Sequence, residues 1–259
     1  MSDGSKVFIN PMEKAEVLNA SFAKQCSAPA YHPDNFPCIL PSSKSAFHFD
    51  KIAPSEVLNQ LSSLNCWKAP GTDGISNRIL KECRQQIYGS FTYSFNLSTA
   101  RGHFPQVWKH AVIQPIYKHN GDRSSSLNYW PIALLPNLSK VLESIIRKQL
   151  LQHCLKESCL PDCQFSFVPQ RSTVWQLLSV MEDWSEIIDC GQAVHALFID
   201  ETKAFDRVDH GLLLLKLASI GVQKVELNWF ASYLQGRSIC TSVDNVYSLP
   251  LTINPQWCT

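Results

Sequence analysis

Residues 196–210 read ALFIDETKAFDRVDH, and the interpretation of the whole chain starts from them. The apolar run over residues 193–200, rich in Val, Ile and Phe, predicts a buried strand that ends at Asp200. A buried carboxylate is costly unless it is compensated, and a divalent cation compensates it well because hard cations prefer carboxylate oxygens. An aspartate that follows a strand is more often the N-cap of a helix. On this stretch alone both roles of Asp200 stay open.

Hydrophobic periodicity elsewhere predicts many helices and few strands. The expected helices cover residues 13–22, 57–64, 77–100, 140–153, 174–188, 212–217 and 225–234. Residues 112–118 and 132–135 are expected to form a hairpin with a long loop, because the turn signal HNGD follows the first strand at 119–122. The predicted fold class is therefore α+β and helix-rich.

Composition narrows the class of protein. Hydrophobic residues make up 45% and charged residues 17% of the 259, which is typical of a globular chain. There is no apolar run long enough to span a membrane and no apolar signal core at the N-terminus, so we expect no membrane association. The ten cysteines are scattered, which favours reduced thiols and an intracellular location, in the cytoplasm, the nucleus or both.

Two regions differ from the rest of the chain. Four prolines lie between residues 29 and 41, so we interpret residues 1–50 as an N-terminal arm or linker and residues 51–259 as one domain. Residues 101–156 carry eight basic and two acidic side chains, a net charge of +6, whereas the remainder carries −5. Such a basic section suits a nucleic acid or a polyphosphate, but it is equally compatible with a solvated helix face.

The stretch at 196–210 resembles the first catalytic motif of reverse transcriptases from non-LTR (LINE-type) retrotransposons, whose pattern is close to F-x-D-x-x-K-A-F-D-x-V. Further blocks resemble the same family in the same order along the chain. They are KAPGTDGI at 68–75, PQVWK at 105–109 with PIYK at 115–118, NYWPI at 128–132 with SKVLE at 139–143, and QFSFVPQRST at 164–173. Five collinear blocks over roughly residues 55–235 make the resemblance specific.

The resemblance implies a right-hand polymerase fold with fingers and a partial palm. Its activity would be the addition of dNTPs to a DNA primer on an RNA template, using two Mg²⁺ ions. Asp200 matches the catalytic aspartate that binds both ions, and Phe205 matches the side chain that excludes a ribose 2′-hydroxyl. Lys118 matches a fingers lysine that faces the triphosphate of the incoming nucleotide. An ordinary core role for Phe205 stays open.

Other basic residues have less defined roles. Arg123 either assists Lys118 in substrate binding or is solvated, and Arg171 contacts the template backbone or caps the next helix. Arg147 and Lys148 are expected to bind nucleic-acid backbone.

Acidic residues and cysteines near the motifs have structural interpretations. We interpret Asp206 and Asp209 as structural, because the next helix needs an N-cap, and His210 as a core or capping residue. A zinc site is an alternative for one cluster, but its spacing fits no familiar ligand pair. That cluster is His153, Cys154, Cys159 and Cys163.

The chain departs from the family pattern at several positions. Trp130 and Val168 stand where the family has arginine, so two positive charges that face substrate are missing. Ser166 and Gln170 replace glycines, and either would be strained if its backbone needs a positive φ.

The C-terminal part departs further. No Asp-Asp pair occurs in the chain, so the second metal-binding motif is absent and the thumb is missing. We therefore expect a C-terminally truncated domain that is inactive by itself. The alternatives are a non-catalytic nucleic-acid-binding remnant and a relic without function.

Overall fold

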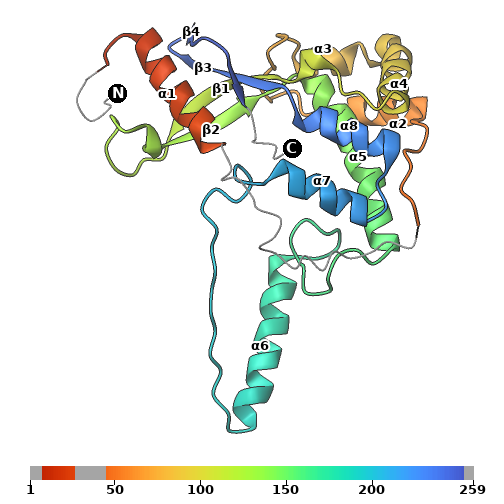
Figure 1. The fold of residues 1–259 in the computed structure, drawn as a ribbon, viewed down its shortest axis with the longest axis vertical. Helices are drawn as coiled ribbons and strands as arrows, with labels where there is room; N and C mark the ends of the chain where they lie inside the picture. The colour runs from red at the N-terminus through yellow and green to blue at the C-terminus, as the bar shows by residue number, and fades with distance from the viewer. Residues whose placement is uncertain (1–7, 27–44, 254–259) are drawn as a thin grey trace.

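A computed structural model describes residues 8–26 and 45–253 of the chain. Within these residues helices and one sheet are combined, which confirms the predicted α+β class (Figure 1). Residues 1–7 and 27–44 of the predicted arm, which include the proline-rich segment at 29–41, lie outside the described residues. No described helix has the length and hydropathy that a membrane span requires.

One five-stranded sheet brings two distant parts of the chain together. Its strands are β1 (His110–Tyr117), β2 (Tyr129–Leu134), β3 (Arg237–Val243), β4 (Val246–Tyr247) and β5 (Leu251–Ile253). β1 and β2 are antiparallel, with Val112 opposite Leu134, which confirms the predicted hairpin and its long loop. β3 runs parallel to β1 and pairs on its other side with β4 and β5, although no strand was predicted after residue 234.

The predicted helices form, with one division. They are α1 (Pro11–Gln25), α2 (Pro54–Ser62), α3 (Asn77–Glu82), α4 (Arg84–Ala100), α5 (Asn137–Lys156), α6 (Thr173–Asp189), α7 (His210–Ser219) and α8 (Lys224–Leu234). The helix expected over 77–100 is two helices, because Cys83 has a ψ of 5° and interrupts the α conformation. Short 3₁₀ turns, η2 (Gln106–Trp108) and η3 (Ser126–Asn128), precede β1 and β2.

The main hydrophobic core surrounds α5. Val141, Leu142, Ile145 and Ile146 pack with side chains of α2 and α4 and with Trp229 of α8. Each fully buried side chain of this size stabilises the fold by about 1.5–3 kcal/mol. The α5 stripe therefore holds the helical part of the molecule together.

A second core lies between α1 and the sheet. Leu18 and Phe22 of α1 pack against Ala111, Ile113 and Ile239 of β1 and β3. Figure 1 shows α1 lying across this sheet. Helix α1 thus covers one face of the sheet. The predicted boundary between an arm at residues 1–50 and a domain at residues 51–259 stays a prediction.

The buried strand predicted over residues 193–200 does not form. Leu197, Phe198 and Ile199 are 85%, 86% and 80% exposed, and the segment runs alone beside the protruding helix α6 (Figure 1). A strand is stable only when its backbone groups pair with a neighbour and one of its faces is covered. The described residues supply neither, so this prediction is wrong.

Candidate nucleotide and nucleic-acid site

Asp200 lies exposed on the extended segment that precedes α7. It is not the N-cap of that helix, because the Asp209 carboxylate accepts the Leu212 backbone N–H at 2.8 Å. The structural role predicted for Asp209 is thereby confirmed. Within residues 8–26 and 45–253 no three acidic, histidine or cysteine side chains come close enough to hold a metal. Asp200 thus offers one carboxylate, and the described residues do not fit a two-ion magnesium site.

Lys203, in the turn after Asp200, is within electrostatic range of the β1–β2 hairpin. Burial lowers the pKa of Lys203, and the nearby ammonium group of Lys118 lowers it further, while the Asp206 carboxylate opposes both. Lys118 follows β1 and donates from Nζ to the Leu127 carbonyl at 2.7 Å across the hairpin loop. The fold therefore brings Lys118 close enough to the segment that carries Asp200 to affect the pKa of Lys203. Lys203, which links the hairpin to this segment, was not among the predicted site residues.

Arg123 points toward a different cavity. Its guanidinium lies 5.0 Å from the centre of the Tyr117 ring, and its carbonyl accepts the Tyr129 hydroxyl at 2.9 Å. It lines a cavity of about 380 Å³ that is bounded also by Lys14 and Asp244. The Arg123 side chain thus packs on the hairpin. No contact among the described residues links it to Asp200.

Phe205 connects the first motif to the block at 164–173. Its ring is 79% exposed and meets the Phe167 ring edge-on at 5.9 Å. Phe205 is therefore not an ordinary core residue in this structure. Phe167 was not predicted as part of the site, since an aromatic residue in a loop gives no signal of its own.

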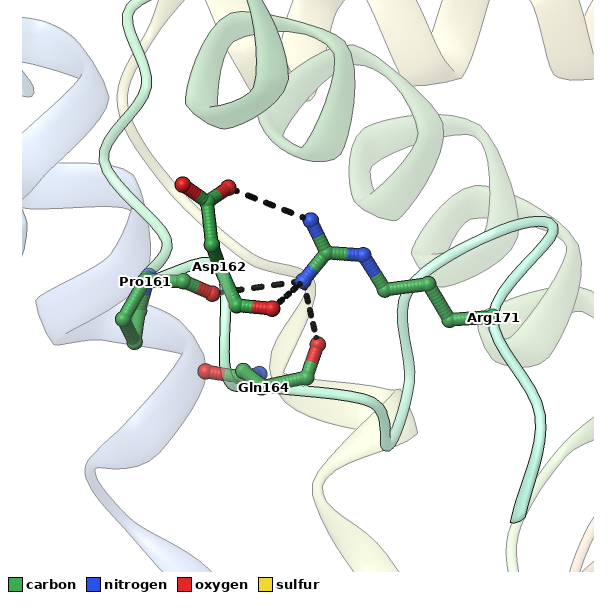
Figure 2. Close-up of polar contacts among 4 residues, drawn as sticks. All are labelled: Pro161, Asp162, Gln164 and Arg171. Atoms are coloured by element: carbon green, nitrogen blue, oxygen red, sulfur yellow. Dashed lines mark hydrogen bonds and ion pairs between the residues drawn. The ribbon is translucent and has the colours of Figure 1, made fainter. Parts of the chain in front are cut away.

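Arg171 holds the loop that precedes α6. Figure 2 shows its guanidinium facing three backbone carbonyls, with Nη1 at 2.6 Å from the Asp162 oxygen and 2.7 Å from the Gln164 oxygen. The Pro161 carbonyl lies at 3.3 Å, and Nη2 is 3.5 Å from the Asp162 carboxylate. The cap of α6 is Ser172, whose hydroxyl accepts the Trp175 N–H. The alternative in which Arg171 caps this helix is therefore wrong.

Arg147 and Lys148 are both exposed on α5 but have different surroundings. Lys148 Nζ lies 4.0 Å from the Glu56 carboxylate of α2. Arg147 is at the rim of a largely apolar groove of about 560 Å³ between α5 and α8. An exposed pair at 4.0 Å holds its lysine only weakly, so both cations are accessible to a phosphate backbone.

Comparison with known proteins identifies the family. A family model described as reverse transcriptase (RNA-dependent DNA polymerase) matches residues 116–254, which include both Lys118 and Asp200. The chain belongs to the reverse transcriptase family. The predicted resemblance is thereby confirmed.

Named relatives of this reverse transcriptase chain come from non-LTR elements. It is 34% identical over 207 residues to a probable RNA-directed DNA polymerase from transposon BS of Drosophila melanogaster, covering 77% of this chain and 22% of the relative. The polymerase of the mobile element jockey, also from D. melanogaster, is 30% identical over 243 residues, 92% of this chain and 26% of the relative. A Pol polyprotein of the R1 element of Bradysia coprophila is 32% identical over 187 residues, which cover 71% of this chain and 18% of the relative. The chain spans about a quarter of these relatives or less.

The positions where the reverse transcriptase chain departs from its family pattern have distinct environments. Trp130 is exposed on β2, opposite Ile116 in the sheet, whereas Val168 is buried. Gln170 has a φ of 64°, so the strain expected on loss of a glycine is present there. Ser166 is absent from the described positive-φ residues, and its substitution carries no such strain.

In the cysteine and histidine cluster of the reverse transcriptase chain, His153 and Cys154 have structural surroundings. His153 donates from Nε2 to the Ile220 carbonyl at 2.7 Å and so ties α5 to the end of α7. Cys154 is buried, and burial is the main reason that its pKa rises to about 11. Within the described residues these side chains do not come together in a group that could hold a metal, so the zinc alternative finds no support.

Proposed function

We propose that this chain forms the fingers and the first part of the palm of a LINE-type reverse transcriptase, with the incoming dNTP bound between Lys118 and the segment that carries Asp200. The observation that carries the proposal is that Lys118 and Lys203, two cations from distant parts of the chain that both lie in the matched family region, are within electrostatic range of each other. Neighbouring ammonium groups repel unless an anion lies between them, and a triphosphate supplies that charge. In this arrangement Phe205 lies on the same segment and would contact the sugar.

Metal binding is proposed for Asp200 alone. Family membership supports Mg²⁺ as the ion, which would supply charge stabilisation for phosphoryl transfer when bound. Because Asp200 has no neighbouring group of ligands in the described residues, we propose that the 259-residue chain does not polymerise by itself.

Primer extension on an RNA template with Mg²⁺ tests this proposal. The chain would be assayed alone and after fusion to the C-terminal remainder of the jockey polymerase. We expect incorporation only by the fusion, loss of incorporation in its Asp200→Asn variant, and normal incorporation in Asp183→Asn, which changes an exposed carboxylate on α6. Incorporation by the chain alone would contradict the proposed inactivity. Incorporation by the Asp200→Asn fusion would contradict the metal role.

A second function is favoured by the exposed cations of α5. We propose that the chain binds single-stranded RNA through Arg147 and Lys148, inside the cell and without sequence preference. The logarithm of the binding constant should then fall linearly with the logarithm of salt concentration. Arg147→Gln or Lys148→Gln should each reduce that slope by about 1. Failure of the chain to bind RNA at low salt would contradict this second function.

The same measurement tests Arg171 as a nucleic-acid contact. Its guanidinium already has carbonyl partners in its own loop. A reduction of the slope by about 1 in Arg171→Gln would assign it to the RNA backbone, and an unchanged slope would assign it to the loop alone.

A further inference from the structure

A second polar cavity lies at the opposite end of β1 from Lys118. It has a volume of about 530 Å³ and is bounded by η2, the start of β1 and the end of α8. Its polar lining comprises His103, Gln106, Lys109, Asn228, Ser232 and Gln235. All of these side chains can donate hydrogen bonds and none is a carboxylate.

Lys109 is the charged group of this cavity. The residue is only 5% exposed, and the Nζ atom lies 3.4 Å from the Ser232 hydroxyl. Burial lowers its pKa, and the nearby Arg237 lowers it further. Among the described residues no carboxylate lies within ion-pair distance of Lys109. A buried ammonium group without a counter-charge is costly, so the site favours an added anion.

The hydroxyl of Ser232 connects Lys109 to other polar groups of the cavity. Its hydroxyl oxygen accepts the Phe104 backbone N–H at 3.1 Å and a hydrogen of Lys109 Nζ at 3.4 Å. These two donors together occupy both lone pairs of the oxygen. The Ser232 hydroxyl also lies 3.3 Å from Nδ1 of His103. His103 lies at the exposed rim of the cavity, where its ring can present a further N–H donor.

We propose that this cavity binds a phosphate group, with Lys109 as the charge partner and His103, Gln106 and Asn228 as hydrogen-bond donors. Phosphate has several strong acceptor oxygens, which match a cavity whose polar side chains can all donate and include no carboxylate. β1 separates this site from Lys118, and a strand of this length places the two lysines about 30 Å apart. The cavity is thus distinct from the proposed dNTP site and independent of it.

Inorganic phosphate tests the proposal in the full 259-residue chain, without template or primer. At constant ionic strength, phosphate should raise the thermal unfolding midpoint of the wild-type protein relative to chloride. Lys109→Met should weaken phosphate binding at least tenfold. Because that variant changes a buried residue, Asn228→Asp provides a second test: it places a carboxylate in the cavity at an exposed position. Lys51→Met, which removes an exposed lysine elsewhere, should bind phosphate like the wild type.

A short single-stranded RNA without terminal phosphates distinguishes the two sources of phosphate. Loss of RNA affinity in both Lys109→Met and Asn228→Asp would identify a backbone phosphate as the ligand. Unchanged RNA affinity beside weakened binding of inorganic phosphate would identify a free phosphate compound. The proposal is overturned if phosphate does not stabilise the wild-type protein, or if Asn228→Asp binds phosphate as well as Lys51→Met does.

Discussion

Gln170 illustrates what a single substitution does to a loop that the family builds with glycine. Its φ of 64° lies in the left-handed region, where a side chain costs about 1 kcal/mol. We expect Gln170→Gly to increase the hydrogen-exchange protection of the Arg171–Trp175 amides about fivefold. Ser166→Gly is the matched control, because Ser166 is absent from the described positive-φ residues and glycine there only adds freedom to the unfolded chain. Equal protection changes in both variants would show that φ is not the cause.

Cys154 gives the fold a measurable dependence on pH. Burial, and secondarily Cys159, raises the pKa of its thiol from an ordinary value near 9 to about 11. The unfolded chain therefore loses this proton first, and its contribution to stability is complete below pH 9 and is lost as the pH rises toward 11.

Urea unfolding of the wild type and of Cys154→Ala isolates this contribution from other titrating groups. The difference in free energy of unfolding between them should fall by about 2 kcal/mol from pH 8 to pH 10.5. A difference that stays constant over this interval would contradict the effect of burial on the thiol.

Secondary-structure elements whose stabilising contacts are local could be predicted from the sequence. The α5 stripe repeats at helical spacing, and the HNGD turn marks the β1–β2 hairpin, so both were predicted close to their observed bounds. The apolar run at 193–200 has the composition of a strand, but composition does not supply a partner strand. For the same reason β3 was missed: it forms through parallel pairing with β1, which lies far away in the chain.

In the candidate site, too, residues in contiguous motifs could be predicted and residues that depend on distant contacts could not. Lys118, Asp200 and Phe205 could be named because their motifs are contiguous in the sequence. Lys203 and Phe167 depend on which segments lie side by side, and only the fold supplies that information. The partners of Arg171 were missed too, because backbone carbonyls leave no signature in the sequence.

The start of α7 provides a test at the scale of one element. Asp209→Ala removes the acceptor of the Leu212 N–H and should destabilise the chain by about 1 kcal/mol. Asp206→Ala removes a nearby carboxylate that caps no helix, so its effect should stay below about 0.5 kcal/mol. Urea unfolding of the two variants checks both values, and similar losses would contradict the capping role.

The whole molecule divides into a packed body and a protruding unit. α5 and α8 share one buried cluster and α1 shares another with the sheet, whereas α6 has no buried residue and extends away from them (Figure 1). The apolar side chains of α6, among them Val174, Leu177 and Met181, are exposed. Hydrophobic stabilisation depends on the area removed from water, so α6 adds little to the stability of the body.

Two leucine substitutions measure this division. Leu142 is fully buried at the centre of the main core, so Leu142→Ala should lower the free energy of unfolding by about 3 kcal/mol, through lost burial and the cavity left behind. Leu177 is exposed on α6, so the same truncation there should cost less than about 0.5 kcal/mol. Urea unfolding followed by circular dichroism checks both values. A loss above about 2 kcal/mol for Leu177→Ala would mean that α6 packs in solution against a surface it leaves uncovered in this structure.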